Sequence, residues 1–140
     1  MEEVFVTRSV EETEEAAGRV AASLADGGFI LLFGELGAGK TAFVRGLAKG
    51  LGIDPDDVSS PTFTLIQPYA GTARTLQHVD LYRVQPGFEV DDLGLEDLVG
   101  QGDIVAIEWA DRCSRVLRPA VRVSIDDLGD DHRRITVRTG

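Results

Sequence analysis

The 140-residue sequence is poor in several residue types, and each shortage excludes a class of function. It has one cysteine, Cys113, so neither an internal disulfide nor a cysteine-based zinc cluster can form. This thiol is expected to be a small buried hydrophobic group. The longest apolar run, FILLF, is far too short to cross a membrane. The acidic first residues have no long apolar core of the kind that signal peptides have, so we expect a cytoplasmic protein that does not contact membranes.

Positive charge is also scarce. Two lysines and twelve arginines stand against 24 acidic residues, which gives a net charge of −10. Affinity for nucleic acids depends on cationic contacts to phosphate, and the longest basic run is the pair Arg133–Arg134. We therefore expect no binding to DNA and no direct binding to RNA.

One of the two lysines lies in a glycine-rich segment, GELGAGKT, which begins at Gly34. The segment matches the phosphate-binding pattern G-x-x-x-x-G-K-[ST] at every fixed position and stands between a predicted strand and a predicted helix, as the motif requires. Its glycines let backbone N–H groups face phosphate oxygens. Lys40 is expected to reach the β- and γ-phosphates, and Thr41 to offer its hydroxyl to Mg²⁺. The predicted phosphate-binding residues are Gly34, Glu35, Leu36, Gly37, Ala38, Gly39, Lys40 and Thr41.

Asparagine is missing from the sequence altogether. The guanine-reading signature Asn-Lys-x-Asp is therefore absent, which favours ATP over GTP as the nucleotide.

Two acids stand at the ends of predicted strands, where a P-loop protein needs a carboxylate for Mg²⁺. Glu108 ends the run IVAIE and is the predicted metal ligand. Asp80 ends LQHVD and is predicted either to hold a water in the second shell of the metal or to orient the attacking water. For either residue, the alternative is a solvated strand end. Thr62, in SSPTFT, lies where GTPase-like proteins carry a γ-phosphate sensing loop, although a simple turn fits equally well. His78 shares a strand face with Asp80 and is expected to be a core or hydrogen-bonded histidine.

The hydrophobic pattern predicts an α/β fold in one domain, residues 1–140. We expect a three-layer fold of the P-loop NTPase type, with a mixed parallel and antiparallel sheet flanked by helices. Strands are predicted at 4–6, 29–33, 63–71, 74–84, 103–109 and in a terminal hairpin over 120–139, and helices at 9–27, 40–52 and 110–119, with short helices or loop at 86–102.

The segments GELGAGKT, SSPTFTLIQPY, HVDLYR, LGLEDL and IEWAD, in this order, resemble the bacterial TsaE family. That family is the ATPase needed for threonylcarbamoyladenosine modification of tRNA. The P-loop alone would be unspecific, whereas its combination with SPTFTL, DLYR and EW at these separations is highly specific. The resemblance covers nearly the whole chain.

The resemblance implies ATP and Mg²⁺ as cofactors and the TsaB and TsaD proteins as partners. TsaD would transfer the threonylcarbamoyl group to adenosine 37 of tRNAs that read codons beginning with A, so tRNA would be met only through the complex. The chain itself would be an ATPase. Since it shows no obvious arginine finger, we expect it to be slow alone and stimulated by its partners.

By position, the resemblance also assigns residues. It implies Thr41 and Glu108 as Mg²⁺ ligands, and Asp80, Lys40 and Thr62 as catalytic residues. It further implies an adenine pocket between the segment Thr7 to Glu11 and the terminal hairpin near Asp131, and it places Trp109 at the edge of the active site as a readout of partner or nucleotide state.

Two other interpretations stay open. One is a small kinase that phosphorylates a metabolite, although the chain is short for a P-loop core with both a lid and an acceptor-binding subdomain. The other is a binding module in which ATP holds a conformation and hydrolysis is incidental.

Overall fold

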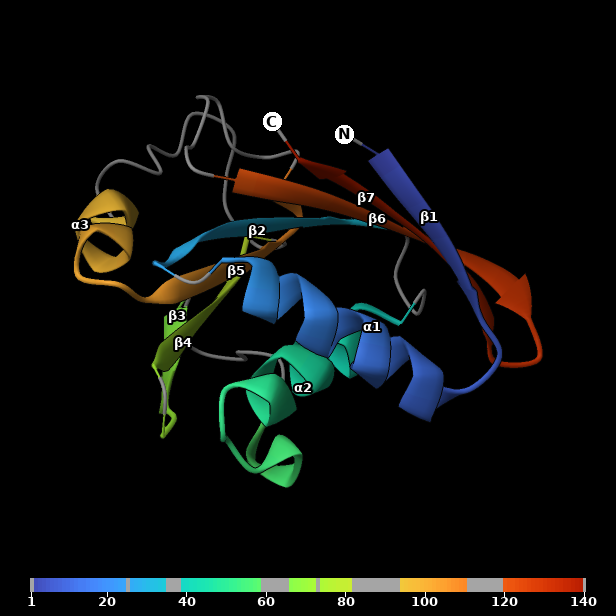
Figure 1. Ribbon diagram of the computed structural model, residues 1–140, viewed down its shortest axis with the longest axis horizontal. Helices are drawn as coiled ribbons and strands as arrows, with labels where there is room; N and C mark the ends of the chain where they lie inside the picture. Colours follow the sequence, from blue (N-terminus) through green and yellow to red (C-terminus); the bar gives the residue numbers. More distant parts are fainter. Residues whose placement is uncertain are drawn as a thin grey trace.

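The computed structural model describes residues 2–24, 26–34, 39–58, 66–72, 74–81, 94–110 and 120–139. Within these ranges the chain forms one seven-stranded sheet with helices on both of its faces (Figure 1). In chain order the elements are β1 (Glu2–Thr7), α1 (Val10–Ser23), β2 (Gly28–Phe33), α2 (Lys40–Gly50), the 3₁₀ turn η1 (Pro55–Asp57), β3 (Ile66–Ala70), β4 (Thr75–Asp80), α3 (Leu95–Gly100), β5 (Ile104–Glu108), β6 (Ala120–Gly129) and β7 (His132–Thr139).

The sheet is mixed, as predicted, and has the order β1-β7-β6-β2-β5-β4-β3. Its four central strands, β6, β2, β5 and β4, run parallel to one another. The outer strands pair antiparallel: β3 with β4 on one side, and β7 with β6 and β1 with β7 on the other. The parallel strands therefore end together at one edge of the sheet.

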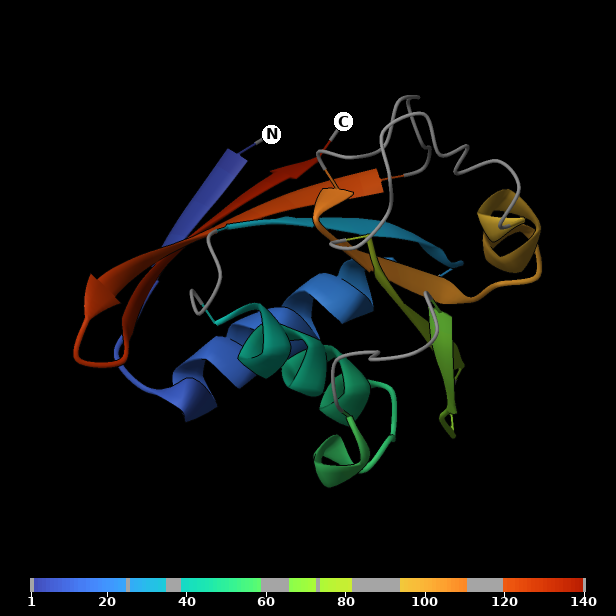
Figure 2. The ribbon, with the colours of Figure 1, turned by 180° about the vertical axis from the view of Figure 1, so that it is seen from behind.

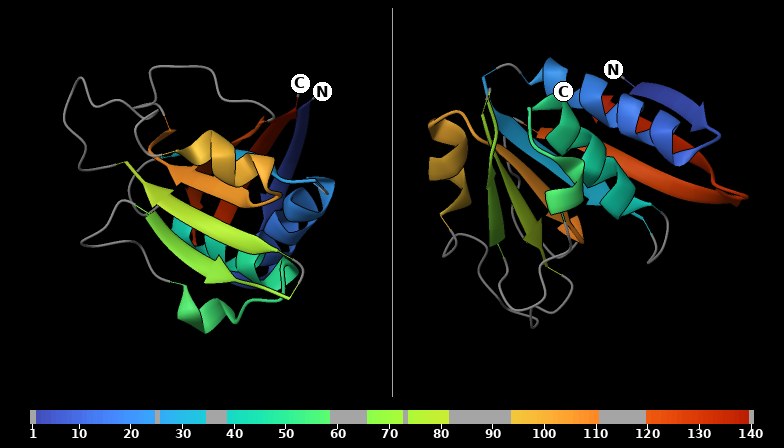
Figure 3. Two further views of the ribbon diagram at one scale, coloured as in Figure 1. Left: turned by 90° about the vertical axis from the view of Figure 1, so that its left-hand side faces the viewer. Right: turned by 90° about the horizontal axis from the view of Figure 1, so that it is seen from below.

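The central strands are buried on both faces, which explains their continuous apolar sequences. Along β2, Ile30 and Leu32 belong to the core beneath α1 and α2, whereas Phe29 and Leu31 belong to the core on the other face. Helices α1 and α2 lie side by side over the first face (Figures 1 and 2). Helix α3 packs on the second face near β5, as the turned views show (Figure 3). The predicted three-layer arrangement is thus confirmed.

Helix α1 is capped at its amino end by Ser9. The Ser9 side chain accepts a hydrogen bond from the Glu12 N–H at 3.1 Å, and the Glu12 carboxylate accepts one from the Arg8 N–H at 3.3 Å. The helix then crosses α2 very closely. A Cβ at Gly46 of α2 would lie 2.4 Å from the carbonyl oxygen of Glu14, so only glycine fits at this crossing without a shift.

Helices α1 and α2 end a few residues before the ends that the sequence predicts, at 27 and 52. The strands predicted at 63–71 and 74–84 correspond to β3 and β4, and residues 63–65 and 82–84 of these predictions lie outside the described ranges. Of the segment 86–102, the structure describes residues 94–102, which include one short helix, α3. Residues 111–119 of the predicted helix 110–119 lie outside the described ranges. Among the described helices, none combines the length and the apolar character needed to span a membrane.

Candidate nucleotide site

The site lies at the carboxyl edge of the parallel strands, where ligands of open α/β sheets bind. Glu108 of β5 is in register with Leu32 of β2 on one side and with Asp80 of β4 on the other. Gly34, the first P-loop residue, follows β2 directly. The fold therefore brings both predicted acids beside the start of the P-loop, although they lie far from it in the sequence.

The predicted P-loop, residues 34–41, ends at the first turn of α2. Gly39, the N-cap residue, has φ of 106°, in the left-handed region that favours glycine, and has no side chain with which to cap the helix. The first N–H groups of a helix have no partner within the helix and carry a partial positive charge. The amino end of α2 is thus suited to receive an anion.

Lys40 begins this helix, and its side chain is folded into the site. The residue is 5% exposed, and Nζ donates a hydrogen bond to the Gly34 carbonyl oxygen at 2.8 Å. The same nitrogen lies 3.9 Å from the centroid of the Trp109 ring, a cation–π contact. Lys40, near the end of the P-loop, therefore contacts Gly34 at its beginning and Trp109 at the end of β5.

Trp109 directly follows Glu108 and has φ of 60°, which is uncommon for a residue other than glycine. Its ring is partly buried against the core on the α3 face and also contacts Lys40. Trp109 thus packs against the core and also contacts the lysine of the candidate site.

The carboxylate of Glu108 is held by a histidine. Glu108 is 4% exposed, and its Oε2 lies 2.5 Å from Nε2 of His78, which is fully buried. The expectation of a hydrogen-bonded core histidine is confirmed. Nδ1 of His78 has no hydrogen-bond partner among the described residues. Because one oxygen of Glu108 is fixed in this way, the orientation of the carboxylate at the strand end is defined.

These residues fit Mg²⁺ by the chemistry of their donors. Mg²⁺ prefers hard oxygen ligands and is commonly held by one or two carboxylates together with phosphate oxygens. Thr41 supplies a hydroxyl in the first turn of α2, and Glu108 supplies a buried carboxylate whose other oxygen is bonded to histidine. Asp80 is half-buried at the adjacent strand end.

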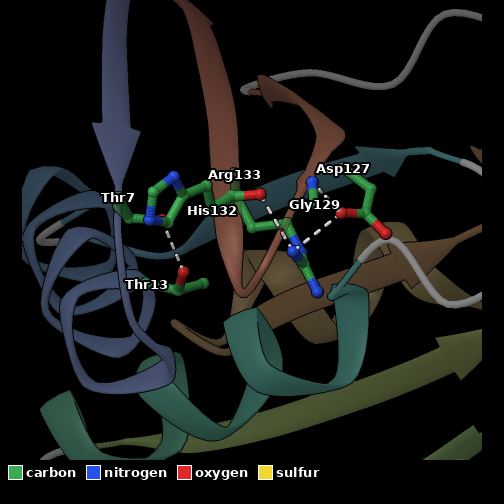
Figure 4. A network of polar contacts seen from close by, with 6 residues as sticks. All are labelled: Thr7, Thr13, Asp127, Gly129, His132 and Arg133. Carbon is green, nitrogen blue, oxygen red and sulfur yellow. Dashed lines mark hydrogen bonds and ion pairs between the residues drawn. The ribbon is translucent and has the colours of Figure 1, made fainter.

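The two segments predicted to flank adenine belong to the end of β1 with the start of α1, and to the terminal hairpin. In the sheet, β1 and β7 lie on the side of β2 opposite to β5 and β4. Thr7 is buried, exchanges a hydrogen bond of 2.8 Å with Thr13, and is the register partner of Arg133 in β7 (Figure 4). Glu11 is exposed in the first turn of α1, and Asp131 is exposed in the hairpin turn with φ of 63°. The fold thus brings the end of β1 beside the terminal hairpin, and the roles of these residues in nucleotide binding stay predictions.

One residue of this site was missed by sequence reasoning. Arg133 packs against the P-loop, since a Cβ on Gly39 would lie 3.1 Å from its Nε. No local pattern identifies it, because the contact depends on how the last hairpin packs onto the sheet. Of the other predicted site residues, Glu35, Leu36, Gly37, Ala38 and Thr62 lie outside the described ranges.

Comparison with known proteins places this arrangement in a family. The family model described as "Threonylcarbamoyl adenosine biosynthesis protein TsaE" matches residues 7–135. Proteins named "tRNA threonylcarbamoyladenosine biosynthesis protein TsaE" are 40% identical in Treponema pallidum (94% of this chain and 97% of that protein) and 42% identical in Bacillus subtilis (93% and 81%). The crystal structure of Bacillus subtilis YdiB matches with a TM-score of 0.75 and 31% identity, and the match covers 100% of this chain and 87% of that one.

The matches extend over nearly the whole length of both partners, and the sheet described above has the same fold as the solved structure. The chain therefore belongs to the TsaE family.

Proposed function

We propose that this chain binds and hydrolyses ATP with Mg²⁺, and that it serves the formation of N6-threonylcarbamoyladenosine at position 37 of tRNAs that read codons beginning with A. In this proposal it acts with the TsaB–TsaD complex and does not itself transfer the threonylcarbamoyl group. Support for the pathway comes from the names of its relatives. Support for the nucleotide chemistry comes from the site.

The observation that carries the proposal is the position of Lys40. Its ammonium is buried at the amino end of α2, and its partners among the described residues are a carbonyl oxygen and an aromatic ring. Neither of these partners carries a formal negative charge, and a buried ammonium is stabilised by an anionic partner. The phosphates of a nucleotide would supply that charge at the place where the P-loop motif predicts them.

The remaining residues supply orientation and proton handling. Mg²⁺, when bound, would supply positive charge that neutralises the charge developing on the phosphates. Thr41 and Glu108 would hold this ion, with His78 keeping the Glu108 carboxylate in place. Asp80, beside Glu108 in the register, would orient the attacking water and accept its proton.

Calorimetry and a reconstituted tRNA-modification assay test the proposal. We expect the wild-type chain to bind ATP in a Mg²⁺-dependent way and to support modification of tRNA by TsaB and TsaD. Lys40→Ala should lose both properties. Lys49→Ala is the matched control, because it removes the other lysine, which is exposed at the end of α2.

The same assays separate the alternatives. Full modification activity from Lys40→Ala would contradict the P-loop assignment. ATP consumption that depends on a metabolite acceptor would favour a kinase. Modification by a variant that binds ATP but does not hydrolyse it would favour a nucleotide-dependent binding module.

A further inference from the structure

The terminal hairpin, formed by β6 and β7, places a second cation, the guanidinium of Arg133, beside the P-loop. The side chain of Arg133 extends from the start of β7 towards the first turn of α2 (Figure 4). A Cβ on Gly39 would lie 3.1 Å from its Nε and 3.6 Å from its Cδ, so the guanidinium stem lies directly against the P-loop backbone. The side chain is 16% exposed. This is a close and mostly buried approach between two segments that lie far apart in the sequence.

The hairpin fixes the guanidinium in this position. Nη1 donates hydrogen bonds of 2.9 Å to Oδ1 of Asp127 and to the carbonyl oxygen of His132. The same Asp127 oxygen accepts the N–H of Gly129 at 2.8 Å, which ties the carboxylate to the hairpin turn. Within the described part of the chain, the hydrogen bonds of the guanidinium all use Nη1, so they orient the group without occupying Nε or Nη2.

The electrostatics of this arrangement favour an anion. The amino end of α2 carries a partial positive charge, and Arg133 lies against Gly39, the N-cap residue of this helix. A guanidinium beside this positive helix end raises the electrostatic energy of the site when no anion is bound, because like charges repel where water is partly excluded. Asp127 offsets one of these charges, but it is 51% exposed and therefore screened. A polyanion bound to the P-loop would relieve the repulsion.

The strand order decides which part of a nucleotide Arg133 can reach. Strands β6 and β7 lie on one side of β2, whereas β5 and β4, which carry Glu108 and Asp80, lie on the other side. A γ-phosphate that meets the metal and the attacking water must face the two acids. The opposite end of the phosphate chain then faces β7, where Thr7, the register partner of Arg133, marks the predicted adenine side.

We propose that Arg133 binds the α/β-phosphate portion of the nucleotide, and that Asp127 positions it. This inference rests on the proposed function of the P-loop. Since ADP and ATP share the α- and β-phosphates, Arg133 contributes equally to the binding of both. It is a binding residue and not an arginine finger for the γ-phosphate, so chemistry at saturating ATP does not depend on it.

Calorimetry with Mg–ADP and with Mg–ATP, beside a phosphate-release assay at saturating ATP, tests this assignment. Arg133→Ala should weaken both affinities by roughly tenfold to a hundredfold, the range for a lost charge-assisted hydrogen bond, and should leave kcat within about twofold. Arg134→Ala is the matched control: it removes the same charge from the next residue of β7, which is exposed, and should change either affinity by less than about twofold. Arg133→Gln keeps a hydrogen-bond donor for Asp127. If Arg133→Ala lowers the thermal stability of the fold, the nucleotide affinities of Arg133→Gln are measured in its place.

The outcomes separate the inference from the function on which it rests. If Lys40→Ala loses nucleotide while both Arg133 variants bind like wild type, Arg133 only supports the hairpin and the inference is overturned. Unchanged affinities with a lower kcat would also overturn it, since they would move Arg133 to the γ-phosphate. If the wild-type chain binds no nucleotide, the proposed function and the inference fail together.

Discussion

Nζ of Lys40 lies 3.9 Å from the centroid of the Trp109 ring, and the same nitrogen donates to the Gly34 carbonyl oxygen. The P-loop lysine is therefore linked directly to the aromatic residue that follows the predicted metal ligand. To contact β- and γ-phosphates, the ammonium must share or leave this ring face. Under the proposed function, we therefore expect nucleotide binding to change the environment of the indole.

This coupling predicts an optical signal. Trp109 is the only tryptophan, so its emission can be followed without labels. Saturating Mg–ATP should change the emission intensity of the wild-type chain, because the cation over the ring is redistributed. Lys40→Met should shift the emission of the nucleotide-free chain, whereas Lys49→Met should not. Unchanged emission under conditions where calorimetry shows saturation would contradict the coupling.

Substitutions of the two acids, Glu108 and Asp80, are expected to impair different steps: the first ATP binding, the second hydrolysis. Glu108→Ala removes a carboxylate from the metal site and should abolish the Mg²⁺-dependent part of ATP affinity. Asp80→Ala should bind Mg–ATP normally but hydrolyse it about a hundredfold more slowly or worse, the loss expected for a general base. Calorimetry with and without Mg²⁺, together with phosphate release, measures both. The reverse pattern would exchange the two roles.

The buried contact between His78 and Glu108 predicts a stability effect. His78→Leu leaves the Glu108 carboxylate buried without its partner and should cost about 3 kcal/mol in the free energy of unfolding by urea. Adding Glu108→Gln should recover part of this loss, since the second change removes the unpaired charge. Additive losses in the double variant would mean that the two side chains do not interact.

A surface ion pair provides the comparison for that experiment. Arg138 and Glu2 also lie within hydrogen-bond distance, at 2.7 Å, but their side chains are 65% and 49% exposed. Solvent screens such a pair, so Arg138→Ala should change stability by less than about 1 kcal/mol.

The crossing of α1 and α2 predicts a second stability effect. Gly46→Ala would push a methyl group into the backbone of Glu14 and should cost about 1–3 kcal/mol by overpacking. Gly100→Ala is the matched control, because a Cβ at this position of α3 meets nothing within 4 Å. It should be neutral or slightly stabilising, given the higher helix propensity of alanine. Equal effects of the two substitutions would show that the helices can separate easily.

Partner dependence is expected at Trp109. The isolated chain should hydrolyse ATP slowly, and TsaB–TsaD should accelerate it. Trp109→Ala should fold and bind nucleotide, yet support tRNA modification poorly, because a large half-buried ring is lost at the edge of the site. Trp109→Phe keeps an aromatic face for Lys40 and should be less impaired. Normal modification by the alanine variant would place the partner surface elsewhere.

Local sequence determined the elements that carry the P-loop. An apolar strand, a glycine-rich turn and an amphipathic helix are encoded within a short segment, so β2, Gly39 and α2 follow from the residues themselves. The apolar run that ends at Glu108 likewise predicted a doubly buried strand with an acid at its end. The start of α1 is also encoded locally, since the side chain of Ser9 accepts a hydrogen bond from the N–H of Glu12, three residues on.

Only the tertiary structure decided how these parts meet. The contact of His78 with Glu108 depends on β4 and β5 being neighbours, and that of Lys40 with Trp109 on α2 starting beside the end of β5. Arg133 reaches Gly39 because the last hairpin pairs with both β2 and β1. Such pairings are set by which apolar faces bury one another across the whole sheet, and no short segment contains that information.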